Sequence, residues 1–142
     1  MRVISDFYKR LSPLQRSFLG ALFGFAFYGG WAVLVNLMHG KESAIKAGLV
    51  QGIYSFILTF FMTLLLETFY LQLRKVVNAE RSAVCLTVLV SCSLVFAGSW
   101  YVNYVSGTPE IFNTVILGYV FGGIYSIVYT LGLARQARVP KH

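Results

Sequence analysis

The chain has 142 residues, of which 57% are hydrophobic and 12% are charged, and its mean hydropathy is +0.69. Soluble globular domains carry about 25% charged residues, so this composition does not supply the polar surface of a water-soluble fold. The net charge of +7 does not imply a nucleic-acid partner, because basic residues at a membrane edge are attracted to anionic lipid head groups.

The first twelve residues predict a short amphipathic helix on the membrane surface. Its apolar residues share one helical face, with charged residues opposite. They are Val3, Ile4, Phe7, Tyr8 and Leu11. Ser12 and Pro13 then form a typical helix start.

Four apolar blocks follow, at residues 14–38, 45–73, 83–105 and 111–134. Each reaches or exceeds the ~20 residues that cross about 30 Å of hydrocarbon as a helix. Lipid cannot hydrogen-bond free backbone groups, so each block is expected to be helical. The chain is therefore predicted to be an all-α integral membrane protein with four transmembrane helices in a single membrane domain, residues 1–142.

The four spans are expected to form two hairpins, residues 13–75 and 81–138, each joined by a short turn. Gly40 and Gly107 stand where the first helix of each hairpin would end in a left-handed residue. Thr108 is expected to cap the last helix, with Pro109 at its first position.

The basic residues predict the orientation of the hairpins. Only Lys41 and Lys46 lie in or beside the two hairpin turns, and the other basic residues lie at the termini or in the middle loop. Cytoplasmic segments are enriched in Lys and Arg, so both termini are expected in the cytoplasm. The residues on that side are Arg2, Lys9, Arg10, Arg16, Arg74, Lys75, Arg81, Arg135, Arg138 and Lys141.

The two hairpins resemble each other in sequence. The stretch FYGGW at residues 27–31 corresponds to FAGSW at residues 96–100, and an Asn-x-x-x-Gly pattern at residues 36–40 recurs at residues 103–107. The phrase Gly-Ile-Tyr-Ser at 52–55 returns at 123–126. We interpret the chain as a tandem repeat whose two hairpins run in the same direction, a parallel repeat.

Residues four apart form a stripe on one helix face, and the second and fourth spans both carry such stripes. The stripes can be interpreted in two ways. Small residues let helices approach closely, which makes the stripes packing surfaces. The glycines concerned are Gly20, Gly24, Gly48, Gly52, Gly118 and Gly122.

The second interpretation is a path for a polar substrate. Polar side chains are costly against lipid, and an ionisable residue inside a span indicates a functional site. This polar stripe consists of Gln51, Ser55, Thr59, Thr63 and Glu67, with Ser126 and Thr130 on the fourth span. Glu67 also has a structural interpretation, in which it lies at the membrane boundary and pairs with a basic residue.

Four basic residues at helix ends are candidates to bind a phosphate, namely Arg74, Lys75, Arg135 and Arg138. Positive charges at these positions also stabilise the negative C-terminal ends of the helices and agree with the enrichment of Lys and Arg on the cytoplasmic side, so they can be explained without a ligand. The sequence contains no nucleophile–base pair, metal-ligand cluster, P-loop or dinucleotide motif. We therefore expect neither an enzyme nor a metal or cofactor site.

The layout resembles the GtrA-like family of small bacterial membrane proteins. The matching residues are Arg16, Ser17, Phe18 and Gly20 in the first span, Ala44 and Lys46 at the start of the second, and Phe69 and Tyr70 at its end. The family's second span usually ends in a basic-aromatic run, whereas residues 66–70 here read LETFY. The resemblance implies a bacterial inner-membrane protein that moves polyprenyl-phosphate-linked sugars.

Together these observations predict a small transporter, or flippase-like protein, for a lipid-linked polar substrate that bears a phosphate. Its expected partners are membrane lipids and further copies of itself, because four helices enclose little volume. The alternative is a non-catalytic accessory or scaffold subunit that docks a larger membrane protein.

Overall fold

The computed structural model describes residues 13–138, so the predicted surface helix at residues 1–12 lies outside the described residues. Every regular element in this range is helical. The elements are α2 (Pro13–Asn36), the short 3₁₀ helix η1 (Leu37–His39), α3 (Lys41–Val76), α4 (Glu80–Val105) and α5 (Ile111–Arg138). All four long helices are long and apolar enough to cross a membrane, which confirms the predicted all-helical class with four candidate spans.

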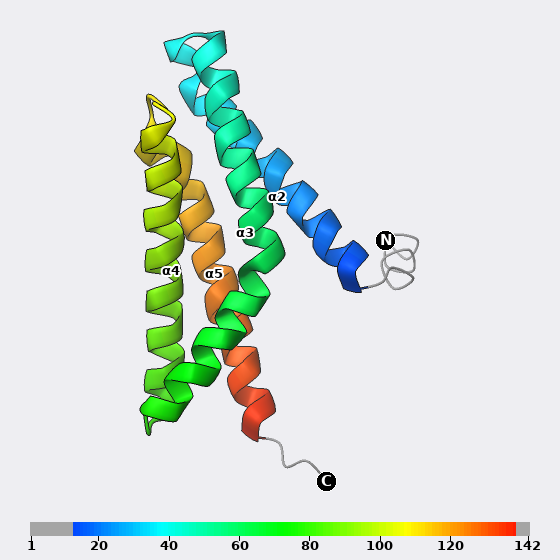
Figure 1. Cartoon of the computed structure of the whole chain (residues 1–142), viewed down its shortest axis with the longest axis vertical. Helices are drawn as coiled ribbons and strands as arrows, with labels where there is room; N and C mark the ends of the chain where they lie inside the picture. The colour runs from blue at the N-terminus through cyan, green and yellow to red at the C-terminus, as the bar shows by residue number, and fades with distance from the viewer. Residues whose placement is uncertain (1–12, 139–142) are drawn as a thin grey trace.

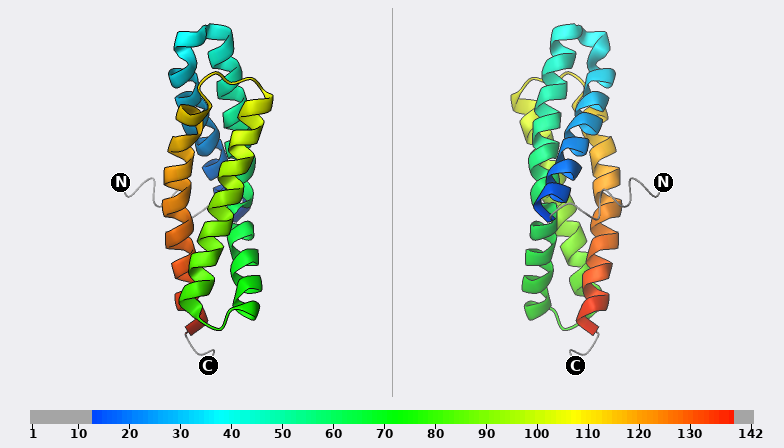
Figure 2. Two further views of the ribbon diagram at one scale, coloured as in Figure 1. Left: turned by 90° about the vertical axis from the view of Figure 1, so that its left-hand side faces the viewer. Right: turned by 90° about the vertical axis from the view of Figure 1, so that its right-hand side faces the viewer.

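The four long helices form a bundle in which both hairpin turns lie at the same end (Figure 1). We call this the turn end; it comprises residues 37–40 and 106–110. The α3–α4 connection, residues 77–79, lies at the opposite end, which we call the loop end. α2 leans away from the other helices toward its N-terminus, whereas α4 and α5 stay side by side (Figures 1 and 2).

α3 is the central element because it contacts all the other long helices. Its 36 residues extend about 54 Å at 1.5 Å per residue, well beyond the ~30 Å hydrocarbon core. The half toward the turn end packs on α2. The half toward the loop end contributes Met62 and Leu66 to a cluster with Val95 of α4, and Tyr70 to a cluster with Ala83 and Ala134.

α2 crosses α3 at glycines. A Cβ atom at Gly29 would lie 2.8 Å from the Gly48 carbonyl oxygen and 3.2 Å from the Gly52 Cα. One at Gly48 would collide with Val33, and one at Gly24 would lie 2.8 Å from the Thr59 hydroxyl oxygen. The backbones therefore approach as closely as small-residue crossings allow in lipid, where van der Waals packing replaces the hydrophobic effect.

The buried face of α4 is a stripe of small and polar residues at every fourth position. It consists of Ala83, Thr87, Ser91, Val95, Ser99 and Asn103. This stripe faces both α3 and α5: Val95 packs against Met62 and Leu66 of α3, and Ala83 packs against Tyr70 of α3 and Ala134 of α5. On α5, Ser126, Thr130 and Ala134 are buried at the same spacing.

At the turn end, hydrogen bonds join the two hairpins. The Asn36 side chain donates to the Thr114 hydroxyl over 2.9 Å and accepts from the Glu110 backbone N–H over 2.9 Å. The Trp31 indole donates to the Asn113 carbonyl over 2.7 Å. His39 Nε2 lies 3.0 Å from Glu110 Oε1. These contacts hold the turn end of α2 against the start of α5.

The turns differ in part from the expectation. Gly107 has a φ of 69°, in the left-handed region, but Gly40 combines a φ of 98° with a ψ of 153°, an extended conformation open to glycine. The predicted capping role of Thr108 is wrong. The Thr108 hydroxyl donates to the Asn103 side chain, and α5 begins only at Ile111. The Glu110 N–H just before α5 donates instead to the Asn36 side chain of the other hairpin. A tertiary contact thus replaces the local cap.

The Glu110 carboxylate gives this end of the bundle a dependence on pH. Hydrogen bonds from His39 and Asn113 lower the pKa of Glu110 from its ordinary value of 4.5. A group with a lowered folded-state pKa contributes stability above its unfolded-state pKa and loses it as the pH falls through the folded value. The contribution of Glu110 is therefore present at neutral pH and lost in acid, below 4.5.

We expect Glu110→Gln to lower the denaturation midpoint at neutral pH, and the difference from the wild type to disappear in acid. The measurement is unfolding by sodium dodecyl sulfate in mixed micelles between neutral pH and about pH 3. Glu42→Gln is the matched control, since the Glu42 side chain is exposed and makes no hydrogen bond within the described residues. A difference that persists unchanged in acid would contradict this role of Glu110.

Candidate functional site

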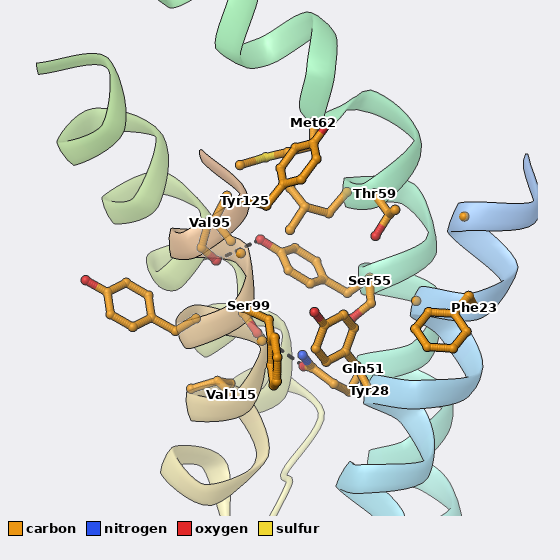
Figure 3. A pocket seen from close by; sticks show the side chains of 18 of the residues that line it. Phe23, Tyr28, Gln51, Ser55, Thr59, Met62, Val95, Ser99, Val115 and Tyr125 are labelled. Carbon is orange, nitrogen blue, oxygen red and sulfur yellow. Dashed lines mark hydrogen bonds between the residues drawn. The ribbon is translucent and has the colours of Figure 1, made fainter. Parts of the chain in front are cut away.

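A cavity of about 420 Å³ lies in the middle of the bundle, between α2 on one side and α4 and α5 on the other, with α3 behind (Figure 3). Its volume falls within the range of small-molecule sites, roughly 300–1,000 Å³. The lining residues are Ser17, Gly20, Phe23, Gly24, Tyr28, Gln51, Tyr54, Ser55, Leu58, Thr59, Met62, Thr63, Val95, Phe96, Ser99, Val115, Gly118, Tyr119, Phe121, Gly122 and Tyr125.

The cavity is neutral, aromatic and hydroxyl-bearing. Among the residues that the structure describes, none of those lining it is charged. Aromatic rings come from all four long helices, for example Phe23, Tyr54, Phe96 and Tyr125. Such a surface binds apolar groups by contact and orients a polar group by a few hydrogen bonds.

Several polar groups on the cavity wall are already hydrogen-bonded inside the protein. Gln51 Oε1 accepts from the Ser99 hydroxyl over 3.1 Å and from the Asn103 side-chain amide over 2.7 Å. The Tyr54 hydroxyl donates to the Val95 carbonyl over 2.9 Å. These bonds fix α3 against α4 and leave the groups involved with less capacity for a ligand.

Other hydroxyl groups on the wall have no such partner. The Ser55 side chain is only 5% exposed, and its hydroxyl makes no hydrogen bond within the described residues. The hydroxyls of Thr59 and Tyr28, which lie near Ser55 on the α3 and α2 sides of the cavity, also make no hydrogen bond within the described residues (Figure 3). The fully enclosed hydroxyl oxygens without a partner in the described part of the chain are those of Ser91 and Thr130, whereas the Ser55 oxygen is open to the cavity and can bond a ligand or water there.

The predicted polar stripe of α3 is divided by the structure. Gln51, Ser55, Thr59 and Thr63 line the cavity, whereas Glu67 does not. Thr63 lies 3.1 Å from the Tyr125 hydroxyl, and Glu67 accepts a hydrogen bond from Tyr129 over 2.6 Å. No basic side chain among the described residues forms an ion pair with Glu67.

The α5 residues that meet the stripe are tyrosines. Ser126 and Thr130 are fully buried, lie outside the cavity wall, and Ser126 bonds back to the Gly122 carbonyl. Tyr125 and Tyr129 precede them by one position, a rotation of about 100° around the helix. The sequence interpretation followed the stripe of every fourth residue from Gly118 and therefore missed the two tyrosines, which lie one position before it.

The glycines predicted for packing lie in the α2–α3 crossing, in the cavity wall, or in both. Gly48 and Gly52 lie in the α2–α3 crossing, and Gly24 lies in both the crossing and the cavity wall. The cavity wall also contains Gly20, Gly118 and Gly122. A Cβ atom at Gly20 or Gly122 would meet no described atom within 4 Å, and one at Gly118 none closer than 3.8 Å.

The basic residues considered for a phosphate lie at the loop end, away from the cavity wall. Arg74 and Lys75 are in the last turn of α3, where Arg74 donates to the Tyr70 hydroxyl and Lys75 to Gln72. Arg135 is exposed near the end of α5, and the Arg138 side chain lies outside the described part. The neutral cavity and the cationic helix ends are therefore separate features.

No family model, curated protein or solved structure matches this chain.

The sequence analysis missed the contribution of α4, which supplies Val95, Phe96 and Ser99 to the cavity. A signal was present, because small or polar residues recur at every fourth position of this span from Ala83 to Asn103. That spacing defines a buried helix face. The aromatic residues Tyr28 and Tyr54 gave no comparable signal, since aromatic residues are frequent on lipid-facing surfaces as well.

Proposed function

We propose that the protein is a small transporter, or flippase-like protein, for a lipid-linked polar substrate that bears a phosphate. The observation that carries the proposal is the unpartnered hydroxyl of Ser55, which is open to a neutral cavity inside a bundle of four apolar helices. A polar floor with aromatic walls suits a molecule that has both a hydrogen-bonding head group and apolar surfaces.

The cavity would receive the uncharged part of the head group. A phosphate is not expected there, because no cation among the described lining residues would compensate its charge. It would instead meet the basic residues of the loop end, Arg74, Lys75, Arg135 and Arg138. With the loop end and both termini in the cytoplasm, as the positive residues favour, the phosphate would be held at the cytoplasmic surface.

This proposal agrees with the resemblance to the GtrA-like family, which implies a polyprenyl-phosphate-linked sugar and the bacterial inner membrane. Many large apolar side chains on the outside of the bundle are exposed, among them Leu34, Ile57, Leu64, Leu89 and Val128. Lipid covers such side chains in a monomer, and further copies cover them in an oligomer. We propose that the protein acts as an oligomer, since one bundle of four helices encloses only this small cavity.

The test is the rate of lipid flipping by purified protein in liposomes of phosphatidylethanolamine and phosphatidylglycerol. The probe is a fluorescent polyprenyl-phosphate-linked monosaccharide. We expect the double variant Ser55→Ala with Thr59→Val to lower the rate about tenfold, because each lost hydrogen bond to the head group is worth about 0.5–1.5 kcal/mol.

Ser93→Ala is the matched control, because Ser93 is an exposed serine of α4 outside the cavity. It should leave the rate unchanged. Wild-type rates from a correctly inserted double variant would refute the proposed role of the hydroxyls. Purification from the native host in mild detergent addresses the alternative function, since a larger membrane protein at fixed stoichiometry, without a bound lipid substrate, would indicate an accessory subunit.

A further inference from the structure

We propose that the cavity opens sideways into the hydrocarbon layer between the loop-end half of α2 and α5, and that this portal admits the apolar chain of a membrane lipid. We further propose that α2 residues 17–28 form the gate that closes it. This inference rests on the proposed function, because it describes how a lipid-linked substrate would reach the cavity.

The first support is the uneven attachment of α2. Its turn-end half is bonded to α5 and to the residue before it through Asn36, Trp31 and their partners Thr114, Glu110 and Asn113. Between residues 17 and 30 the structure describes no hydrogen bond from an α2 side chain to α5. The last ring contact along this side is that of Phe27 with Phe121, whose centroids are 6.0 Å apart.

The second support is the place of the opening. Beyond Phe27 toward the loop end, α2 leans away from the rest of the bundle (Figure 1), and the cavity lies between the diverging helices. Gly20 and Phe23 of α2 and Phe121 and Tyr125 of α5 line the cavity between these two helices. Phe23 is 69% exposed. Because α2 and α5 are both candidate membrane spans, an opening between them faces lipid rather than water.

The third support concerns the occupant. The mouth of the cavity is apolar, and its floor carries the unpartnered hydroxyl of Ser55 beside that of Thr59. An amphiphilic lipid satisfies both surfaces at once, with its chain at the mouth and its head group at the floor. An apolar helix from a second copy would cover the mouth but leave the Ser55 hydroxyl without a hydrogen-bond partner. A single amphiphilic lipid, with its chain at the mouth and the uncharged part of its head group at Ser55, is therefore the occupant that we infer.

The fourth support is that the facing surfaces permit closure. Gly20 and Gly24 on α2 and Gly118 and Gly122 on α5 all lie on the cavity wall. No side chain at these positions prevents α2 from approaching α5. The α2–α3 crossing, where Gly29 meets Gly48, lies next to this segment on its turn-end side and is the place about which we propose that α2 pivots. The Phe25 and Val33 side chains of α2 pack against Gly52 and Gly48 there, and Gly24 lies against Thr59, so closure has to slide these contacts. Closure would seal the mouth over the head group.

The experiment uses disulfide formation in the full chain in liposomes. Cys85 and Cys92 are first replaced by alanine, and the pair Gly20→Cys with Gly122→Cys is introduced; both glycines have free space where a Cβ would lie. The matched control pair is Gly20→Cys with Gly132→Cys, because Gly132 also has free space but lies further toward the loop end of α5. Lipid entry is measured with a phosphatidylglycerol that carries a diazirine on its acyl chain.

We expect oxidation to link Gly20→Cys to Gly122→Cys within one chain and to leave the control pair unlinked. The diazirine should label α2 and α5 residues of the mouth in the reduced protein, and oxidation should reduce this labelling at least tenfold. Failure to form the intramolecular disulfide, or labelling that oxidation does not change, would overturn the gate. A disulfide between two chains would show that a second copy occupies the opening and would overturn the inferred occupant.

These outcomes are distinct from failure of the proposed function. Labelling that responds to the disulfide, in a protein that never flips the fluorescent probe, would support the portal and contradict the transport proposal. Flipping at the normal rate in the oxidised protein would support transport and overturn the portal.

Discussion

Gly29→Ala is expected to destabilise the bundle by about 2 kcal/mol, within the 1–3 kcal/mol typical of overpacking. The added methyl group would lie 2.8 Å from the Gly48 carbonyl oxygen and 3.2 Å from the Gly52 Cα. Both neighbours are backbone atoms of α3, so neither can move aside without displacing the helix. The measurement is the unfolding free energy in mixed micelles of mild detergent and sodium dodecyl sulfate.

Gly30→Ala provides a control at the next position of the same helix. No described atom lies within 4 Å of a Cβ at Gly30. Alanine is the better helix former by about 1 kcal/mol, so this variant should be neutral or slightly stabilised. Equal effects of the two substitutions would show that α2 and α3 do not cross at Gly29.

Asn36→Ala is expected to lower the unfolding free energy by about 2 kcal/mol, because it removes three hydrogen bonds from a fully buried side chain. Two of these bonds join the hairpins, through Thr114 and the Glu110 N–H. Their loss leaves the backbone N–H before α5 without its partner. The measurements are the same unfolding titration and the hydrogen-exchange rate of the Glu110 amide, which should rise.

Asn78→Ala is the comparison for this prediction. Asn78 is an exposed asparagine in the α3–α4 connection that makes no hydrogen bond within the described residues. Its replacement should change neither quantity. If Asn36→Ala left the exchange of the Glu110 amide at its wild-type rate, the contact between the hairpins at the turn end would be refuted.

The number and the extent of the helices were predictable from local sequence. The ends of α2–α5 all fall within about four residues of the ends of the apolar blocks. Lipid imposes this outcome, because an apolar segment of about 20 residues inside it has to bond its own backbone. Gln51 and Ser55 could also be identified as buried polar residues, since neither is stable against lipid.

The partners of these residues could not be read from periodicity. Ser126 was selected on α5 because it continues the stripe of every fourth residue that begins at Gly118, but Tyr125, one position earlier, is the residue that reaches Thr63. Helix periodicity predicts which residues share one face of a helix, but it does not predict which neighbouring helix or side chain packs against that face. The cap of α5 likewise came from Asn36, 74 positions away, rather than from Thr108.

The sequence by itself determined that residues 13–138 form four long apolar helices connected by short turns, because backbone hydrogen bonding in lipid depends only on the local segment. The tertiary structure alone decided that a cavity exists, since the cavity depends on the tilt of α2 away from α5. That tilt results from the glycine crossing with α3 and the hydrogen bonds at the turn end. These contacts join residues distant in the sequence, and their geometry is set by the packing of whole helices.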